Sequence, residues 1–182
     1  VPSAEREFSF ISKPFKETEL SFRVGGPIDR FEVYAGNFYH RGDIIAEIDS
    51  RDFRIRKERA EAIYHQAKAE FERIKVLYEK DNLSASAYEK AHADYTSART
   101  AYETAVNELE DTRLIAPFDG YIGEVYIEKY QDVKATQSVV SFIDITQLKI
   151  EAYVTQEIAF QAKEIKEVGI RFDVRPEVVY PA

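Results

Sequence analysis

The spacing of apolar residues changes twice along the chain and separates β-rich ends from a helical middle. Between residues 20 and 49, short alternations of apolar and polar residues are interrupted by turn signals such as GGP at 25–27 and RGD at 41–43. This pattern predicts short strands joined by tight turns. From Ser50 the apolar residues recur at steps of three and four, and after Thr112 the strand pattern returns. The sequence therefore predicts an α+β protein with helices inserted between two strand regions.

Two heptad patterns follow one another in the middle of the chain. In each, aromatic residues mostly alternate with alanines; Ile74 and Leu109 are other apolar members, and Lys57 breaks the first pattern. Two such helices joined by a few residues are expected to fold back as an antiparallel coiled-coil hairpin, with large side chains of one helix over small ones of the other. Ser86 and Glu89 have the capping-box spacing for the start of the second helix. The predicted seam is formed by Phe53, Ala60, Tyr64, Ala67, Phe71, Ile74 and Tyr78 in the first helix and by Tyr88, Ala91, Tyr95, Ala98, Tyr102, Ala105 and Leu109 in the second.

The two strand regions repeat one another. One shift of 94 residues sets Gly26 on Gly120 and matches apolar with apolar residues on both sides. Two such units, each unable to bury its apolar face alone, are expected to pack into one small sandwich. The matched pairs are Ile28 with Ile122, Phe31 with Val125, Val33 with Ile127, Ile45 with Val139, and Ile48 with Phe142.

The chain ends predict a second β module. Residues 1–20 alternate loosely with a break at Pro14, and the C-terminal part predicts a strand over 149–154, a short helix over 156–164 and further strands. Because the hairpin must leave and re-enter the sandwich at neighbouring points, the hairpin is inserted in the sequence of the sandwich, and the sandwich is inserted in that of the outer β module. The predicted domains are an incomplete β-barrel module from 1–19 and 146–182, a sandwich from 20–50 and 113–145, and a helical hairpin from 51–112 with its tip near 78–86.

Composition and charge narrow the function. The chain has 25 Lys and Arg against 33 Asp and Glu, a net charge of -8, which argues against a nucleic-acid partner and favours a protein partner. It has no cysteine, so thiolate metal sites are excluded. It has no methionine, even at the first position, which predicts a piece of a longer protein. No apolar run reaches the length of a membrane span, so the chain is expected to be soluble, and any membrane anchor is expected in segments absent from it.

No residue pattern predicts catalysis or cofactor binding. Asp119 precedes a glycine and is expected to form a turn, because no base or nucleophile accompanies it. The histidines His40, His65 and His92 are scattered and lack metal-ligand spacing. We therefore expect a protein that is not an enzyme and holds neither a cofactor nor a metal.

The phrase APFDG at 116–120, the half-motif at 26–49 and the inserted heptad hairpin together resemble the HlyD-like membrane fusion proteins, the periplasmic adaptors of bacterial tripartite efflux and secretion systems. The resemblance covers about residues 20–180. It implies an elongated, nested fold in which the hairpin is inserted in a lipoyl-like sandwich, itself inserted in a partial β-barrel. It also implies a non-enzymatic adaptor in the periplasm, tethered to the inner membrane in the full-length protein. Such an adaptor links an inner-membrane transporter to an outer-membrane channel and self-associates into a ring.

A motif at the predicted tip sharpens this resemblance. Members that serve pumps of the resistance-nodulation-division type carry Arg, then Leu four residues later and Ser seven further on, and this spacing occurs here as Arg73, Leu77 and Ser84. The resemblance implies that these residues dock on the channel, with Leu77 making the apolar contact and Arg73 hydrogen-bonding. From the residues alone, Arg73 is equally a surface arginine paired with Glu70 or Glu72, and Ser84 is equally an N-cap.

Two other functions fit parts of the sequence. A lipoyl or biotinyl carrier would use the same sandwich, with a modified lysine at the turn between the half-motifs. In this chain the hairpin replaces that turn after Asp49, which removes the candidate lysine. A cytosolic coiled-coil scaffold would use the hairpin but has no need of a split sandwich at its base. The periplasmic adaptor is therefore the favoured prediction.

Overall fold

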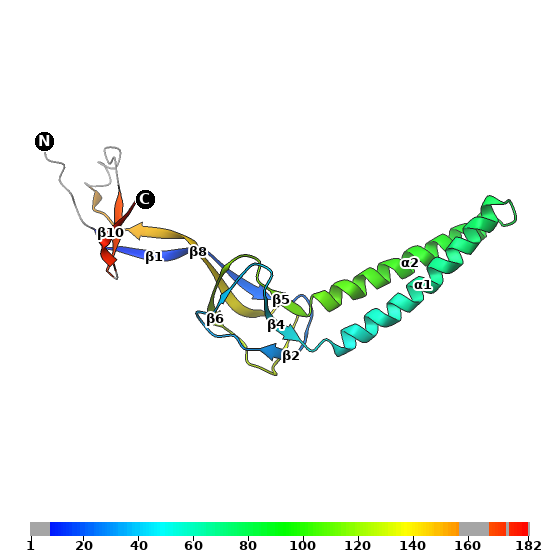
Figure 1. Ribbon diagram of the computed structural model, residues 1–182, viewed down its shortest axis with the longest axis horizontal. Coiled ribbons are helices and arrows are strands. Elements are labelled where there is room, and N and C mark those ends of the chain that lie inside the picture. Colours follow the sequence, from blue (N-terminus) through cyan, green and yellow to red (C-terminus); the bar gives the residue numbers. More distant parts are fainter. Residues whose placement is uncertain (1–7, 157–167, 174, 182) are drawn as a thin grey trace. The chain divides into compact units, whose positions relative to one another are not determined.

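The computed structural model describes residues 8–156, 168–173 and 175–181 (Figure 1). The chain forms two compact units, one from the segments up to Lys13 and from Leu148 onward, the other from Pro14–Gln147. Two long strands, β1 (Phe10–Ser21) and β8 (Ser138–Ala152), contribute residues to both units.

The smaller unit is β-rich. Its strands β9 (Gly169–Phe172) and β10 (Arg175–Pro181) pair antiparallel, and the ring of Phe10 meets that of Phe172 edge-on with centroids 5.8 Å apart. The strand predicted at 149–154 is present as the end of β8, which stops at Ala152. The break predicted at Pro14 is wrong, because β1 continues across this residue. An edge strand tolerates proline, since its outer N–H groups need no partner. The helix predicted over 156–164 lies, apart from its first residue, outside the described residues.

The larger unit contains a sandwich of two four-stranded sheets. Their strand orders are β1-β8-β6-β3 and β5-β4-β2-β7. The 94-residue shift carries the second order onto the first, and both edge strands of each sheet come from the other half of the chain. The remaining strands are β2 (Gly26–Phe31), β3 (Phe38–Tyr39), β4 (Ile44–Ile48), β5 (Arg113–Ile115), β6 (Gly120–Val125) and β7 (Asp132–Val133).

Hydrogen bonds between the repeats follow the same shift. The N–H of Ile28 donates to the carbonyl of Gln131 at 3.0 Å, and the N–H of Ile122 donates to that of Asn37 at 2.9 Å. Each of these bonds is the image of the other under the shift. The relation also holds for the bonds from Gly42 to Ala116 and from Thr136 to Phe22, and for the turns in which Asn37 and Gln131 accept from the backbone of Tyr34 and Glu128. The predicted repeat is confirmed as a pseudo-twofold relation between the half-motifs.

The core of the sandwich consists of the matched apolar residues. Of the five predicted pairs only Val125 is partly exposed, and Phe142 is fully buried. Burial of this kind is the main favourable contribution to the folding free energy. The buried members are Ile28, Phe31, Val33, Ile45, Ile48, Ile122, Ile127, Val139 and Phe142.

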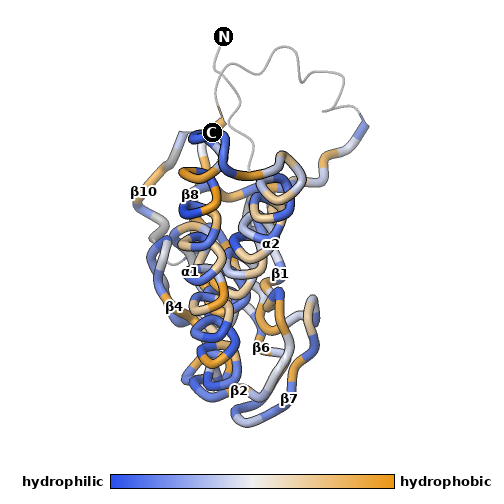
Figure 2. The backbone as a smooth tube through the Cα atoms, turned by 90° about the vertical axis from the view of Figure 1, so that its right-hand side faces the viewer, coloured by the Kyte–Doolittle hydropathy of each residue, from blue (hydrophilic) through white to orange (hydrophobic). Residues whose placement is uncertain are grey.

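Between β4 and β5 the chain leaves the sandwich as two long helices, α1 (Arg51–Glu79) and α2 (Ala85–Glu110), which pack antiparallel (Figure 1). Phe53 of α1 lies in the sandwich core, and Leu109 of α2 packs against it, so both helices are fixed at their base. Hydrophobic and hydrophilic residues alternate along both helices (Figure 2), and neither described helix has an apolar stretch that could cross a membrane. The predicted α+β fold, a hairpin inserted in a split sandwich, is confirmed.

Candidate functional site: the hairpin and its tip

A ladder of aromatic rings joins the two helices. Going toward the tip, Tyr102 stacks on Tyr64, Tyr64 on Tyr95, Tyr95 on Phe71, and Phe71 lies against Tyr88. The ladder ends where Tyr88 stacks on Tyr78, with ring centroids 4.6 Å apart. The predicted packing of large over small side chains is therefore wrong, because the antiparallel register brings the aromatic positions of the two helices to the same height. Ring pairs at such distances stabilise by roughly 0.5–1.5 kcal/mol beyond their burial.

Polar groups of the ladder bond within the hairpin. A hydrogen bond with the phenol of Tyr95 raises the pKa of Tyr64. The hydroxyl of Tyr102 donates to Glu61 at 3.4 Å, and on the outer surface of α2 a hydrogen bond to Asp94 raises the pKa of Lys90. The ring of His92 lies 5.2 Å from that of Phe71. Among the described residues no group of three or more His, Asp or Glu side chains could hold a metal ion.

The end of α1 is closed by its own backbone. The N–H of Asp81 donates to the carbonyl of Tyr78 and the N–H of Asn82 donates to that of Leu77, both at 3.0 Å. Asp81 has φ 57, the left-handed conformation that this paired pattern of bonds requires. Aspartate tolerates it better than most residues because its short polar side chain hydrogen-bonds locally. The tip is therefore a defined turn with most backbone groups satisfied.

Ser84 begins α2. Its backbone is extended (φ -73, ψ 149) and its Oγ accepts a hydrogen bond from the N–H of Ala87 at 3.2 Å. The capping box predicted for Ser86 and Glu89 is wrong, since Ser86 already lies inside the helix. The short turn after α1 leaves Ser84 as the residue that enters the helix. Its hydroxyl therefore has a structural task.

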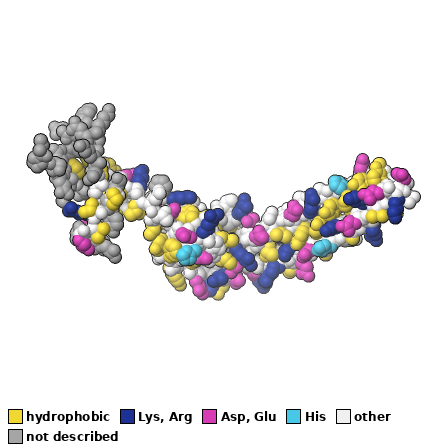
Figure 3. All heavy atoms as spheres, turned by 45° about the horizontal axis from the view of Figure 1, so that its top comes forward, with side chains coloured by type: hydrophobic (Ala, Val, Ile, Leu, Met, Phe, Trp, Pro, Cys, Tyr) yellow, Lys and Arg dark blue, Asp and Glu magenta, His cyan; other side chains and the backbone are white. Residues whose placement is uncertain are grey.

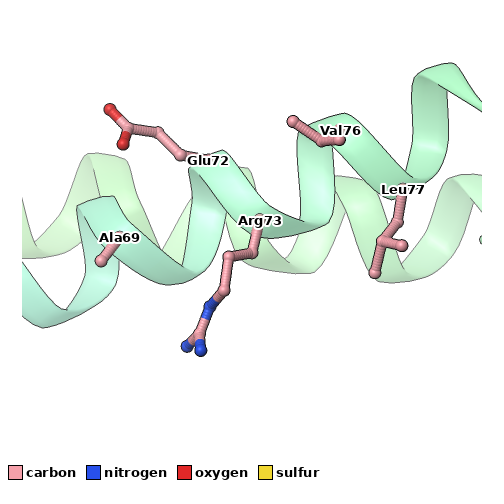
Figure 4. Close-up of a pocket in the computed structure, with 5 residues that line it drawn as sticks. All are labelled: Ala69, Glu72, Arg73, Val76 and Leu77. Atoms are coloured by element: carbon pink, nitrogen blue, oxygen red, sulfur yellow. The ribbon is translucent and has the colours of Figure 1, made fainter.

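A shallow depression lies on the outer surface of α1 just below the tip (Figure 4). The side chains of Arg73 and Leu77 project from the same side of α1, and α2 lies behind α1 in this view. Leu77 is 43% exposed and Val76 is 48% exposed, so the depression offers apolar surface to a partner. The guanidinium of Arg73 is bonded to Glu70, an exposed pair that a partner carboxylate can replace at small cost. The depression is lined by Ala69, Glu72, Arg73, Val76 and Leu77.

The structure thus brings together two of the three residues of the tip motif. Arg73 and Leu77 share the depression, whereas Ser84 lies beyond the turn on α2 and is not part of its lining. Sequence reasoning missed Ala69, Glu72 and Val76. The signal that could have found them is their spacing of three and four residues on the face of α1 opposite the aromatic seam.

The base of the hairpin occupies the turn where a carrier domain would hold its lysine. The chain passes from the end of β4 through Asp49 and Ser50 directly into α1. The guanidinium of Arg51 hydrogen-bonds the carboxylate of Asp49 and lowers its pKa. On the opposite repeat, Asp119 accepts a hydrogen bond from the backbone N–H of Arg41 at 2.7 Å, so its carboxylate joins the two half-motifs.

Charged side chains cover much of the hairpin surface, and hydrophobic side chains interrupt them along its length (Figure 3). Lys and Arg lie close to Asp and Glu, as in the exposed pairs of Lys90 with Asp94 and of Arg99 with Glu103. Exposed pairs of this kind add little to the stability of the hairpin.

Comparison with proteins of known structure gives close matches to this arrangement. A putative efflux transporter from Bacteroides eggerthii is 30% identical with a TM-score of 0.81, and the alignment covers 100% of this chain and 59% of that one. A MacA-MexA chimeric protein that contains the Pseudomonas aeruginosa MexA α-hairpin domain is 20% identical with a TM-score of 0.75, over 97% of this chain and 66% of that one. The second likeness shows the fold alone.

Sequence comparison points in the same direction. The solvent efflux pump periplasmic linker SrpA of Pseudomonas putida is 28% identical over 145 residues, which cover 79% of this chain and 38% of the linker. The chain thus spans less than two fifths of the length of the curated relatives it matches. No protein-family model matches it.

Proposed function

We propose, on the premise that the chain is a homologue of the periplasmic adaptors or membrane fusion proteins of efflux pumps, that it connects an inner-membrane transporter with an outer-membrane channel. In this proposal it acts in the periplasm, tethered to the inner membrane by a segment outside this chain. It carries out no catalysis, and its mechanism is geometric. The β units lie on the transporter side, and α1, with 29 residues, reaches about 43 Å outward at 1.5 Å per residue.

The observation that carries the proposal is the exposed apolar surface at the closed end of the hairpin. The aromatic ladder stops at Tyr78, yet Val76 and Leu77 remain about half exposed beside Arg73. A lone exposed leucine is ordinary, but an apolar depression edged by a cation suits a helix end that offers apolar side chains and a carboxylate or carbonyl acceptor. We propose that helices of an outer-membrane channel fill it, and that the pump is of the resistance-nodulation-division type.

Ser84 supports the same surface indirectly. As the N-cap of α2 it fixes the turn that separates the two helices, and so it holds the depression on α1 at a defined distance from the end of α2. Replacing Ser84 by Asn keeps a capping oxygen, whereas Ala removes it. If Ser84 also touches the channel, the Asn variant will lose function while the fold keeps its stability.

Leu77→Ala in the full-length protein tests the docking site. Alanine is a good helix former, so the hairpin should keep its stability, while contact with the channel loses the leucine side chain. We expect increased sensitivity to pump substrates and less channel protein recovered with the adaptor. Ile63→Ala is the matched control, since Ile63 lies on the same helix, two heptads before Leu77, with 49% exposure against 43%. Equal transport and equal channel recovery in both variants would show that the depression is not the docking site.

A further inference from the structure

The outer face of α1 carries a second heptad pattern. It steps by four and three residues along the side opposite the aromatic ladder, and every member is exposed. The depression of Figure 4 is its end near the tip. Apolar members recur every seven residues and alternate with polar ones, which gives the helix an exposed stripe along which another helix can pack. We call this set the outward α1 seam; it consists of Ile55, Arg59, Ala62, Gln66, Ala69, Arg73 and Val76.

The outer face of α2 carries a heptad of small and polar residues. The hydroxyls of Thr100 and Thr104 donate to the carbonyls of Thr96 and Thr100 at 2.8 and 2.9 Å, so they are satisfied within the helix. All members are exposed, and their small side chains allow another helix to approach closely. We call this set the outward α2 seam; it consists of Lys90, Ala93, Ser97, Thr100, Thr104 and Asn107.

The aromatic ladder sets the heights of the two seams. In the stacked pairs of Tyr64 with Tyr102, Phe71 with Tyr95, and Tyr78 with Tyr88, the residue numbers add up to 166 each time. Residues of α1 and α2 whose numbers add up to 166 therefore lie at the same height. This rule matches every member of the outward α1 seam except Ile55 with a member of the outward α2 seam: Arg59 with Asn107, Ala62 with Thr104, Gln66 with Thr100, Ala69 with Ser97, Arg73 with Ala93, and Val76 with Lys90.

The charges beside the seams have the same register. Arg59 and Arg73 lie two heptads apart on α1, and Glu89 and Glu103 are separated by the same interval on α2. Arg73 lies at the height of Ala93, and Glu89 lies four residues from Ala93 toward the tip. In the same way, Glu103 lies four residues toward the tip from Asn107, which is at the height of Arg59. One turn is about 5.4 Å, which both long side chains can span. Two copies placed side by side at equal height would therefore pair both arginines with glutamates.

We infer that a second copy of this chain covers the outward α1 seam with its outward α2 seam. The contact is heterologous, because different faces of the two copies meet, and repetition of such a contact closes a ring when the rotation permits it. Copies related by an axis parallel to the hairpin keep residues at equal height, which the matched registers require. The inference rests on the proposed function and on the ring of adaptors that the family resemblance implies, and it identifies the helix faces that join neighbouring hairpins. The neighbouring copy would then cover the depression at Ala69, near its Ser97, whereas Leu77 lies outside the outward α1 seam and stays available to the channel.

Cysteine cross-linking of mixed copies tests this contact. Cells co-express full-length Ala69→Cys and Ser97→Cys variants in a background otherwise free of cysteines that could be cross-linked, and mild oxidation traps neighbouring pairs. We expect disulfide-linked heterodimers, about tenfold more abundant than with Ala69→Cys and Thr104→Cys, because a heptad offset moves the partner by about 10 Å, beyond disulfide reach. Predominant homodimers of either variant, the absence of cross-links, or cross-links from residue 69 only to a channel protein would each overturn the inference.

A charge exchange provides a second, independent measurement. Arg59→Glu introduced into the Ala69→Cys copy should lower the heterodimer yield about tenfold through like-charge repulsion, and Glu103→Arg in the Ser97→Cys copy should restore it. Arg59 lies two heptads from Arg73, outside the proposed docking site. A yield that is unchanged by the first exchange, or not restored by the second, would contradict the register. If Leu77→Ala abolishes transport while the cross-links are absent, the contact between copies is wrong and the docking proposal stands. If the cross-links form and Leu77→Ala leaves transport unchanged, the contact stands and the docking proposal is wrong.

Discussion

The sandwich and the hairpin belong to one unit but are held together in different ways. In the sandwich, residues such as Phe142 and Ile28 are almost completely buried, with exposed fractions of 0% and 1%. In the hairpin, only Phe53, Ala98 and Ala105 are buried, and the stacked aromatic rings remain partly exposed. The sandwich therefore depends on the removal of apolar surface from water, whereas the hairpin depends on ring stacking and on its attachment to the sandwich.

This difference suits an adaptor. A two-helix hairpin cannot enclose a core, so each helix keeps an outer face that is free to meet other proteins. The sandwich has used most of its large apolar residues internally and fixes both ends of the hairpin through Phe53 and Leu109. Stability and binding surface are thus divided between the two regions. Substitutions in each region should reveal this division through how much stability they remove and how far along the structure their effect extends.

The largest effect is expected from Phe142→Ala in the sandwich. Removing this fully buried ring leaves a cavity at the centre of the core, and such changes destabilise by roughly 3–5 kcal/mol. Because the hairpin is anchored in that core, helical circular dichroism should be lost in the same urea transition as the tertiary signal. A hairpin that stays helical after the sandwich has unfolded would show that the two regions fold independently.

A smaller, local effect is expected from Tyr95→Ala in the hairpin. Tyr95 stacks on both Tyr64 and Phe71, so its loss interrupts the ladder at its middle and should cost about 1–3 kcal/mol. Hydrogen exchange should accelerate in the tip half of both helices and remain slow in the sandwich. Tyr95→Phe is the control, because it keeps the ring and removes only the hydrogen bond to Tyr64. Equal effects of the two substitutions would assign the stabilisation to the hydrogen bond instead of to stacking.

Local periodicity explains why much of the fold could be predicted from the sequence. The heptads predict the helices correctly because an apolar side chain is needed at each seam position. The helix α1 begins at Arg51, directly after the predicted change of period. The 94-residue repeat could be found because its apolar pairs form one shared core. The stacking of rings on rings could not be predicted, since it depends on the register between two helices. That register is a tertiary property, which neither helix pattern contains by itself.

The candidate site shows the same limit. The exposure of Leu77 follows from its place off the aromatic seam, and the sequence predicts it. The start of α2 at Ser84 instead of Ser86 depends on how few residues the turn needs, which the backbone of Asp81 determines. Docking of Arg73, Leu77 and Ser84 on a channel stays a prediction.

The smallest expected effect compares the two repeats of the sandwich directly. Gly42 and Thr136 are related by the 94-residue shift and both have positive φ, 92° and 66°. A β-branched residue is strained in this conformation by roughly 1–2 kcal/mol, while glycine costs roughly 0.5–1 kcal/mol more in unfolded-chain entropy. Thr136→Gly should therefore stabilise by about 0.5 kcal/mol, seen as a slightly higher urea midpoint. The converse Gly42→Thr should destabilise because backbone strain exceeds the gain in unfolded-chain entropy, and no steric clash adds to it, since a Cβ at Gly42 meets no atom within 4 Å. If Thr136→Gly stabilises the protein and Gly42→Thr destabilises it, the turn in the second repeat has a conformation that its sequence does not favour. Pairing with the first repeat then imposes that conformation.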